Sequence, residues 1–311
     1  MSSLTDTDKF GRILLDGNQP LKNRFRALFA LRNIGGADAI RYISLAFSDS
    51  SVLLKHELAF CLGQMQDRTA VPLLTQILSD TSEDSMVRHE AGEALGAIGS
   101  AESLEVLIKF KSDSAPEVAE TCYLASERIK WLEGSATIEP LSQNPYNSVD
   151  PTPPNPLNCN QQGGQPESVE ELKQILLDRN APLWDRYRAM FSLRNIGSDE
   201  AITILGEGLK CFESALFRHE IAYVLGQIQS PLSIDALRDC LAKTEENYMV
   251  RHECAEALGS IGTDDCRVIL QPYLSDIEPV VRESCIVALD ITDYEQSNEF
   301  DLTDNWNNCN S

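Results

Sequence analysis

Basic residues are few in this chain compared with acidic ones. Lysine and arginine number 26 and aspartate and glutamate 48, so the net charge is −22 at neutral pH. Such a charge disfavours nucleic acid and anionic membranes as partners and suits a basic protein or a polyamine-like ligand, although a solvated acidic surface explains the same balance. No apolar run comes near the roughly 18 residues that a membrane span needs, and no apolar leader follows Met1. We expect a soluble, unprocessed protein.

Cysteine pairs and spare histidines are lacking too. The nine cysteines are scattered and form no C-x-x-C, so we expect neither a zinc knuckle nor a disulfide framework. This pattern indicates a reducing compartment, the cytoplasm and also the nucleus. All four histidines precede a glutamate, so none remains for a Ser-His-Asp or Cys-His arrangement. H-E-x-x-H, G-x-G-x-x-G and G-x-x-x-x-G-K-[ST] are also absent, which removes support for a zincin fold and for these nucleotide-binding loops.

Two levels of repetition organise the residues that are present. The segment 20–35 (PLKNRFRALFALRNIG) recurs at 182–197, 56–66 recurs at 219–229, and 87–99 recurs at 250–262, so the chain is a duplication. Within each half a smaller unit recurs about every 32 residues, marked by the His-Glu position and, six residues later, by Leu-Gly. We expect the glycines of these markers to allow close helix packing. The markers are Leu62-Gly63, Leu95-Gly96, Leu225-Gly226 and Leu258-Gly259.

Each small unit has the pattern of two short helices. An apolar-periodic stretch such as 70–78 begins near a proline and precedes the helix that carries the His-Glu position, and no strand-like alternation occurs. Two helices in a period of about 32 residues are typical of an α-solenoid. We therefore predict an all-α fold, an α-solenoid of helical hairpins in two duplicated halves of four hairpins each.

The predicted halves span residues 1–133 and 168–292. Residues 134–167 lie between them and contain seven of the fourteen prolines, together with many Asn, Gln and Gly residues. This composition predicts a linker that is too long and too polar for a packed loop. Residues 293–311 are acidic, rich in asparagine and aperiodic, which predicts a disordered tail.

The histidines form pairs of His-Glu motifs, 33 residues apart within each half. The motifs are His56-Glu57, His89-Glu90, His219-Glu220 and His252-Glu253. With about 100° per residue on a helix, each motif faces away from the apolar arc of its helix. The first and last units of each half carry other residues at this position, so the motif is not an obligate packing element.

Neighbouring helices of a solenoid lie about 8–10 Å apart, so two of them can direct two imidazoles and a carboxylate at one ion. This donor set is typical of non-haem Fe(II) sites that leave positions open for oxygen. A single such histidine is explained as a solvated surface residue, but four, each beside a glutamate, favour metal ligation. Two duplicated halves then suggest two metals.

The set of motifs resembles the deoxyhypusine hydroxylase family, whose members are HEAT-repeat proteins of two four-hairpin halves with two His-Glu motifs in each. The resemblance rests on KHELAFCLGQMQ, VRHEAGEALGAIG, RHEIAYVLGQIQ and VRHECAEALGSIG, and it covers residues 10–132 and 168–292. It implies a di-iron monooxygenase with two Fe(II) ions and O2 as co-substrate. The reaction so implied is hydroxylation of the deoxyhypusine side chain of translation initiation factor 5A, which completes hypusine.

By position, the resemblance assigns one iron to His56, His89 and Glu90. It assigns the other iron to His219, His252 and Glu253, in one dinuclear centre with ligands from both halves. Glu57 and Glu220 either ligate iron or pair with the amines of the long cationic substrate side chain, and we favour the second role. No catalytic residue is implied beyond the metal site.

Two rival functions stay open. A metal-free scaffold, similar to the short HEAT-like repeats of bilin lyases and adaptor proteins, would bind a partner by shape and use the His-Glu pairs only as surface caps. A dinuclear manganese or zinc hydrolase would use the same imidazole and carboxylate ligands, because these donors do not select iron by affinity alone.

Overall fold

Helices form where the apolar periodicity predicts them. The computed structural model describes residues 5–134, 140–156 and 168–296, and among these residues it contains sixteen α-helices and no strand. The first half contains α1 (Asp6–Leu15), α2 (Leu21–Ile34), α3 (Gly36–Leu45), α4 (Val52–Met65), α5 (Val71–Ser79), α6 (Ser85–Ile98), α7 (Leu104–Phe110) and α8 (Pro116–Gly134). The second contains α9 (Val169–Leu177), α10 (Leu183–Ile196), α11 (Asp199–Gly208), α12 (Ala215–Ile228), α13 (Ile234–Leu241), α14 (Tyr248–Ile261), α15 (Asp264–Leu270) and α16 (Pro279–Gln296).

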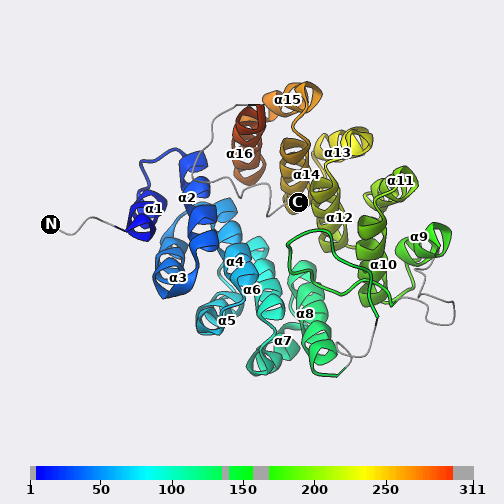
Figure 1. Cartoon of the computed structure of the whole chain (residues 1–311), viewed down its shortest axis with the longest axis horizontal. Coiled ribbons are helices and arrows are strands. Elements are labelled where there is room, and N and C mark those ends of the chain that lie inside the picture. The colour runs from blue at the N-terminus through cyan, green and yellow to red at the C-terminus, as the bar shows by residue number, and fades with distance from the viewer. Residues whose placement is uncertain (1–4, 135–139, 157–167, 297–311) are drawn as a thin grey trace. The chain divides into compact units, whose positions relative to one another are not determined.

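Each half is a two-layer stack of four helical hairpins. The odd-numbered helices form an outer layer and the even-numbered helices an inner layer, as Figure 1 shows for α3, α5 and α7 beside α4, α6 and α8. Within the inner layers α4 packs on α6, α12 on α14, and α14 on α16. The predicted all-α solenoid of two four-hairpin halves is therefore confirmed.

The four Leu-Gly glycines lie where neighbouring inner helices approach most closely. A Cβ atom added at Gly63 would stand 2.8 Å from the Ala94 Cα, and one at Gly226 would stand 3.0 Å from the Ala257 Cα. Gly96 and Gly259 meet the next inner helix in the same way. These distances leave no room for a side chain, so the predicted packing role of the glycines is confirmed.

The inner helices that carry the His-Glu motifs have defined ends. Each begins at a polar N-cap whose side chain accepts a backbone N–H of the first turn: Ser51, Asp84, Ser214 and Asn247. Each ends in a left-handed residue: Gln66, Gly99, Gln229 and Gly262. The left-handed conformation is unfavourable for glutamine, but here each glutamine side chain donates to a carbonyl of the next inner helix, Ala97 or Ser260.

The segment between the halves differs from the predicted unpacked linker. Residues 140–156 have no helix, and their one regular feature is an isolated bridge between Leu141 and Pro156. Residues 151–154 are nevertheless buried, and the segment makes buried hydrogen bonds to α10. Residues 135–139 and 157–167 of the predicted linker lie outside the described residues. The content of proline and asparagine therefore predicted correctly that the segment has no helix. The prediction that it is not packed against the rest of the protein was wrong for residues 151–154.

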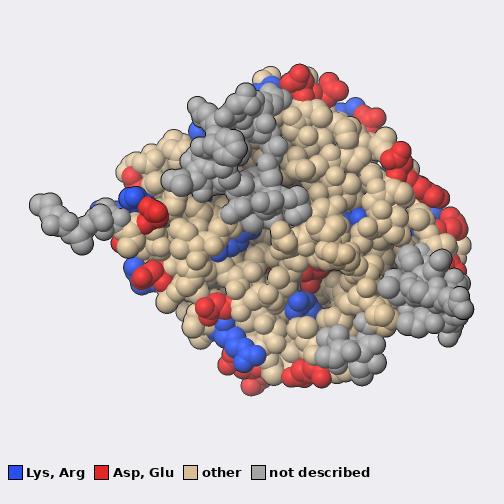
Figure 2. Space-filling view, in the orientation of Figure 1, with Lys and Arg blue, Asp and Glu red and all other residues tan. Residues whose placement is uncertain are grey.

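The end of the second half also extends beyond its predicted limit, because α16 continues to Gln296. Most of the predicted tail, residues 297–311, lies outside the described residues. Figure 2 shows acidic side chains along the edge of the molecule that the outer helices of the second half form. Among the acidic residues of these helices, Asp199 of α11 and Asp235 and Asp239 of α13 are exposed. No described helix has the length and apolar character that crossing a bilayer requires.

Candidate metal centre

A basic residue directly precedes each histidine and anchors the helix that carries it. Arg88 of α6 pairs with Asp113 at 2.6 Å, and Arg251 of α14 pairs with Asp276 at 2.6 Å. The Nε atom of each arginine also donates to a backbone carbonyl of the outer helix in its own hairpin, at 3.1 and 2.9 Å. The hydrogen bond from Arg88 is the main reason that the pKa of Asp113 lies below its ordinary value. The first turn of each inner helix is thus fixed immediately before its histidine.

In the first half, His56 of α4 lies beside His89 and Glu90 of α6. The His56 Nε2 atom is 3.2 Å from the Glu90 Oε2 atom, and the two imidazole centroids are 5.4 Å apart. One donor atom from each of the three residues falls within 4.8 Å of the other two. All three side chains are buried, at most 3% exposed. A solvated surface role is therefore excluded for these histidines.

Two glutamates, Glu57 and Glu90, lie on either side of the His56 ring. Burial is the largest influence on His56 and lowers its pKa, but the Glu90 and Glu57 carboxylates together outweigh it. The pKa of His56 therefore lies well above its ordinary value. Glu57 contributes through a contact of 3.2 Å between its Oε1 atom and the His56 Nδ1 atom. The two carboxylates thus make this cluster an environment that favours a cation.

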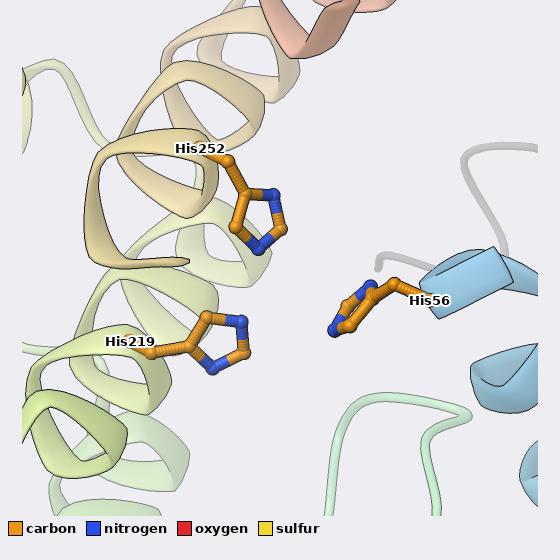
Figure 3. A group of neighbouring side chains, drawn as sticks. All are labelled: His56, His219 and His252. Carbon is orange, nitrogen blue, oxygen red and sulfur yellow. The ribbon is translucent and has the colours of Figure 1, made fainter. Parts of the chain in front are cut away.

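The second half repeats the arrangement. The Glu253 Oε2 atom of α14 lies 3.4 Å from the Nε2 atom of His219 and 3.8 Å from the Nε2 atom of His252. The His219 and His252 centroids are 5.3 Å apart, and Figure 3 shows the two rings projecting to the same side of α12 and α14. All three side chains are buried. Glu253 thus lies beside both histidines of the second set, as Glu90 lies beside His56 in the first. That each set holds one ion stays a prediction.

Glu57 and Glu220 are buried beside the two clusters, at 6% and 2% exposed. Glu57 contacts His56 Nδ1, which is the nitrogen that faces away from Glu90. Each of these glutamates follows its histidine on the same helix, so each lies next to the donor set. Their positions leave both predicted roles available, that of a ligand and that of a partner for a substrate amine.

Sequence reasoning missed Glu256 and Ser284. The Glu256 Oε1 atom lies 3.6 Å from the Nδ1 atom of His252, and Ser284 donates to the same oxygen at 3.2 Å. His252, Glu253 and Glu256 form a further group of donors within 4.8 Å. Glu256 therefore faces the ring nitrogen of His252 that points away from Glu253. The signal was available as H-E-x-x-E, which occurs at residues 89–93 and again at 252–256.

The donor atoms fit a divalent metal ion. Ligand bonds of about 2.0–2.2 Å place donors on opposite sides of one ion roughly 4.2 Å apart and adjacent donors closer, and the spacing of His56, His89 and Glu90 requires only a small contraction. Two imidazoles with one carboxylate leave coordination positions open, unlike the closed four-ligand sets of structural zinc. The chemistry of the donors therefore suits a metal that binds further ligands.

Comparison with known proteins establishes the family. HEAT-repeat models match residues 42–126 and 169–248, and a model of the PBS lyase HEAT-like repeat matches 250–276. Deoxyhypusine hydroxylase of Danio rerio is 56% identical over 306 residues, covering 98% of this chain and 97% of its own. The Homo sapiens enzyme is 53% identical over 299 residues, covering 96% and 95%. The chain belongs to the deoxyhypusine hydroxylase family.

A solved structure supports the same assignment to the deoxyhypusine hydroxylase family. Human deoxyhypusine hydroxylase in complex with glycerol superposes with a TM-score of 0.87 at 54% identity, over 93% of this chain and 96% of that one. The resemblance drawn from the His-Glu motifs is therefore confirmed, and the chain is an enzyme, a monooxygenase of the deoxyhypusine hydroxylase family. The rival prediction of a scaffold without enzymatic activity is not supported by these relatives.

Proposed function

We propose that this chain hydroxylates the deoxyhypusine side chain of translation initiation factor 5A in a reaction that depends on Fe(II) and O2. The observation that carries the proposal is the pair of buried His-His-Glu clusters in a chain more than half identical to curated deoxyhypusine hydroxylases. Imidazole and carboxylate donors with open positions favour an oxygen-activating iron over a structural metal.

The proposed ligands divide between the halves as the sequence predicts. His56, His89 and Glu90 would hold one ion, and His219, His252 and Glu253 the other. The chemistry supplied by bound iron is the reductive activation of dioxygen. For each turnover the substrate C–H bond, O2, two electrons and two protons give the alcohol and water, so an external reductant is required. That both irons share one centre stays a prediction.

The protein's own groups would bind and orient the substrate. The deoxyhypusine side chain is long and carries amines, and Glu57 and Glu220 place buried carboxylates beside the two clusters. Buried carboxylates attract such a chain strongly, because little water screens them. The net charge of −22 adds a longer-range attraction for the cationic side chain. These carboxylates would position the substrate side chain, and the burial of the two clusters would limit the access of water to them.

The decisive experiment combines metal content with product mass. Protein loaded with Fe(II) without oxygen should hold about two irons per chain, and on admission of O2 it should add the mass of one oxygen atom to the deoxyhypusine-bearing acceptor protein. His89→Ala and His252→Ala should each remove about one iron and abolish the mass gain. Asp239→Asn, an exposed position on α13, is the control and should change neither quantity.

Two results would contradict the proposal. Loaded protein that holds no stoichiometric iron, or that holds iron but leaves the acceptor protein unmodified in the presence of O2 and a reductant, would refute it. A hydrolytic activity that manganese or zinc supports in the absence of O2 would favour the hydrolase instead. Glu57→Ala and Glu220→Ala decide the remaining roles, since retained iron with weaker substrate binding supports substrate contact and lost iron supports ligation.

A further inference from the structure

Residues 140–156 are built into the inner surface of the second half. Arg188 of α10 donates from Nε and from a terminal nitrogen to the Pro154 carbonyl, at 3.2 and 2.9 Å. The Asn155 N–H donates to the Ser192 hydroxyl of α10 at 2.8 Å. Asp150 accepts from both terminal nitrogens of Arg194, at 2.8 and 2.7 Å. So many specific contacts along α10 are not needed merely to connect two halves.

Arg194 is the centre of these contacts. Its side chain is fully buried, and besides Asp150 it donates to the Asn144 and Gln227 side-chain oxygens at 3.0 and 2.9 Å. Its guanidinium also lies 4.9 Å from the centroid of the Tyr146 ring. A buried guanidinium needs acceptors for its donors, and the 140–156 segment supplies several of them. The segment and α10 are therefore one hydrogen-bonded unit.

This unit fixes the side chain of Gln227 on α12. Because Arg194 can only donate, the Gln227 oxygen must be the atom that faces it, and the amide nitrogen points the other way. That nitrogen donates to the Ser148 hydroxyl at 3.0 Å and to the Tyr223 hydroxyl at 3.3 Å. The Tyr223 oxygen is thus an acceptor from Gln227. Its own proton is directed elsewhere.

Tyr223 stands on the face of α12 that carries the His-Glu motif. At about 100° per residue, position 223 lies roughly 40° around the helix from His219, between the directions of His219 and Glu220 and one turn further on. Burial is the main cause that raises the pKa of Tyr223, and the negative charges of Asp150 and Glu220 add to it. Tyr223 also follows Glu220 by three residues on α12, a spacing that makes the two side chains neighbours on one face of the helix.

We propose that the 140–156 segment is part of the second His-Glu site, where it acts through Arg194 and Gln227 to hold the Tyr223 hydroxyl as a hydrogen-bond donor to Glu220. Tyr223 is then a positioning residue. It orients the Glu220 carboxylate toward the cationic substrate side chain, a role that rests on the proposed function. Position 60, the counterpart of Tyr223 in the first half, is phenylalanine. The duplicated sites are therefore not equivalent, and the second binds the substrate amine through a fixed carboxylate.

The test is binding of the deoxyhypusine-bearing acceptor protein to iron-loaded enzyme without oxygen. Tyr223→Phe removes one hydroxyl and little volume. We expect a Kd about three- to tenfold higher, the usual effect of one lost hydrogen bond, with unchanged iron content and a nearly unchanged kcat. Tyr273→Phe removes a phenol elsewhere in the same half and should leave the Kd unchanged. In a Glu220→Gln background, Tyr223→Phe should have no further effect, because it acts through Glu220.

Each failure has its own signature. Wild-type binding with the same Kd for Tyr223→Phe overturns this inference and leaves the proposed function intact. The inference is also wrong if the two substitutions weaken binding additively, or if Tyr223→Phe loses iron, because the hydroxyl would then act on something other than Glu220. Wild-type enzyme that neither binds nor modifies the acceptor protein overturns both the inference and the proposed function.

Discussion

The two halves of the chain share the placement of their His-Glu motifs but differ in what surrounds them. Imidazole centroids are 5.4 Å apart in the first half and 5.3 Å in the second, and the anchoring pairs Arg88–Asp113 and Arg251–Asp276 have the same length of 2.6 Å. The second half adds the 140–156 segment on α10 and the Tyr223 hydroxyl. Duplication has therefore kept the donor geometry, while the environment of one site has become more elaborate.

The counterpart of Arg194 shows how this difference arose on a common plan. Arg32 of α2 lies over the Phe29 ring at 4.8 Å and donates to the Asn33 side chain. Arg194 lies over the Phe191 ring at 4.7 Å and also donates to the next residue, an asparagine. The second half uses the same arginine to bind Asp150 in addition. A residue already placed by the repeat has thus become the anchor of a new segment.

We expect Asp150→Ala to produce the largest difference between the two halves. Removing the carboxylate leaves the Arg194 guanidinium buried without its ionic partner, and breaking such a pair costs about 3–5 kcal/mol of the free energy of unfolding. Hydrogen exchange should accelerate in α10 and α12 and stay unchanged in α4 and α6, because the ion pair belongs to the second half. Asp199→Asn, exposed on α11, is the control. Unchanged exchange in α10 would show that the segment is only loosely held.

A second comparison uses glycines at different repeats of one half. In Gly259→Ala the new methyl group would lie 2.6 Å from the Ala288 Cβ atom, whereas in Gly226→Ala it would lie 3.1 Å from the Ala257 Cβ atom. The closer contact forces α14 and α16 apart, so we expect Gly259→Ala to lower the free energy of unfolding by about 1–3 kcal/mol. Gly226→Ala should cost less. Denaturant titration measures both, and an equal or reversed order would contradict the packing role assigned to these distances.

The sequence predicts the helices and the proximity of the two His-Glu motifs in each half, because both depend on local periodicity. A repeat of about 32 residues places the Leu-Gly and His-Glu positions of neighbouring hairpins in the same register. The proximity of the two motifs in each half can therefore be predicted without the conformation of any loop. The packing of the 140–156 segment could not be predicted in this way. Ser148 and Gln227 are 79 residues apart in the chain, and Asp150 and Arg194 are 44 apart. Composition reports on local conformation and carries little information about such contacts.

Glu256 was missed for a different reason. The motif H-E-x-x-H requires a histidine four residues after the first one, so a glutamate at that position gave no signal. The substitution Glu256→Gln tests whether the two halves hold their histidines in the same way. With metal on Nε2, the His252 Nδ1–H faces the Glu256 carboxylate, which holds the ring in position. Glu256→Gln keeps the shape but weakens this acceptor. We expect affinity for iron in the second half to fall about 10- to 100-fold, measured by anaerobic competition with a chelator. Glu93→Gln is the matched change in the first half, and unaltered affinity in Glu256→Gln would leave Glu256 without this role.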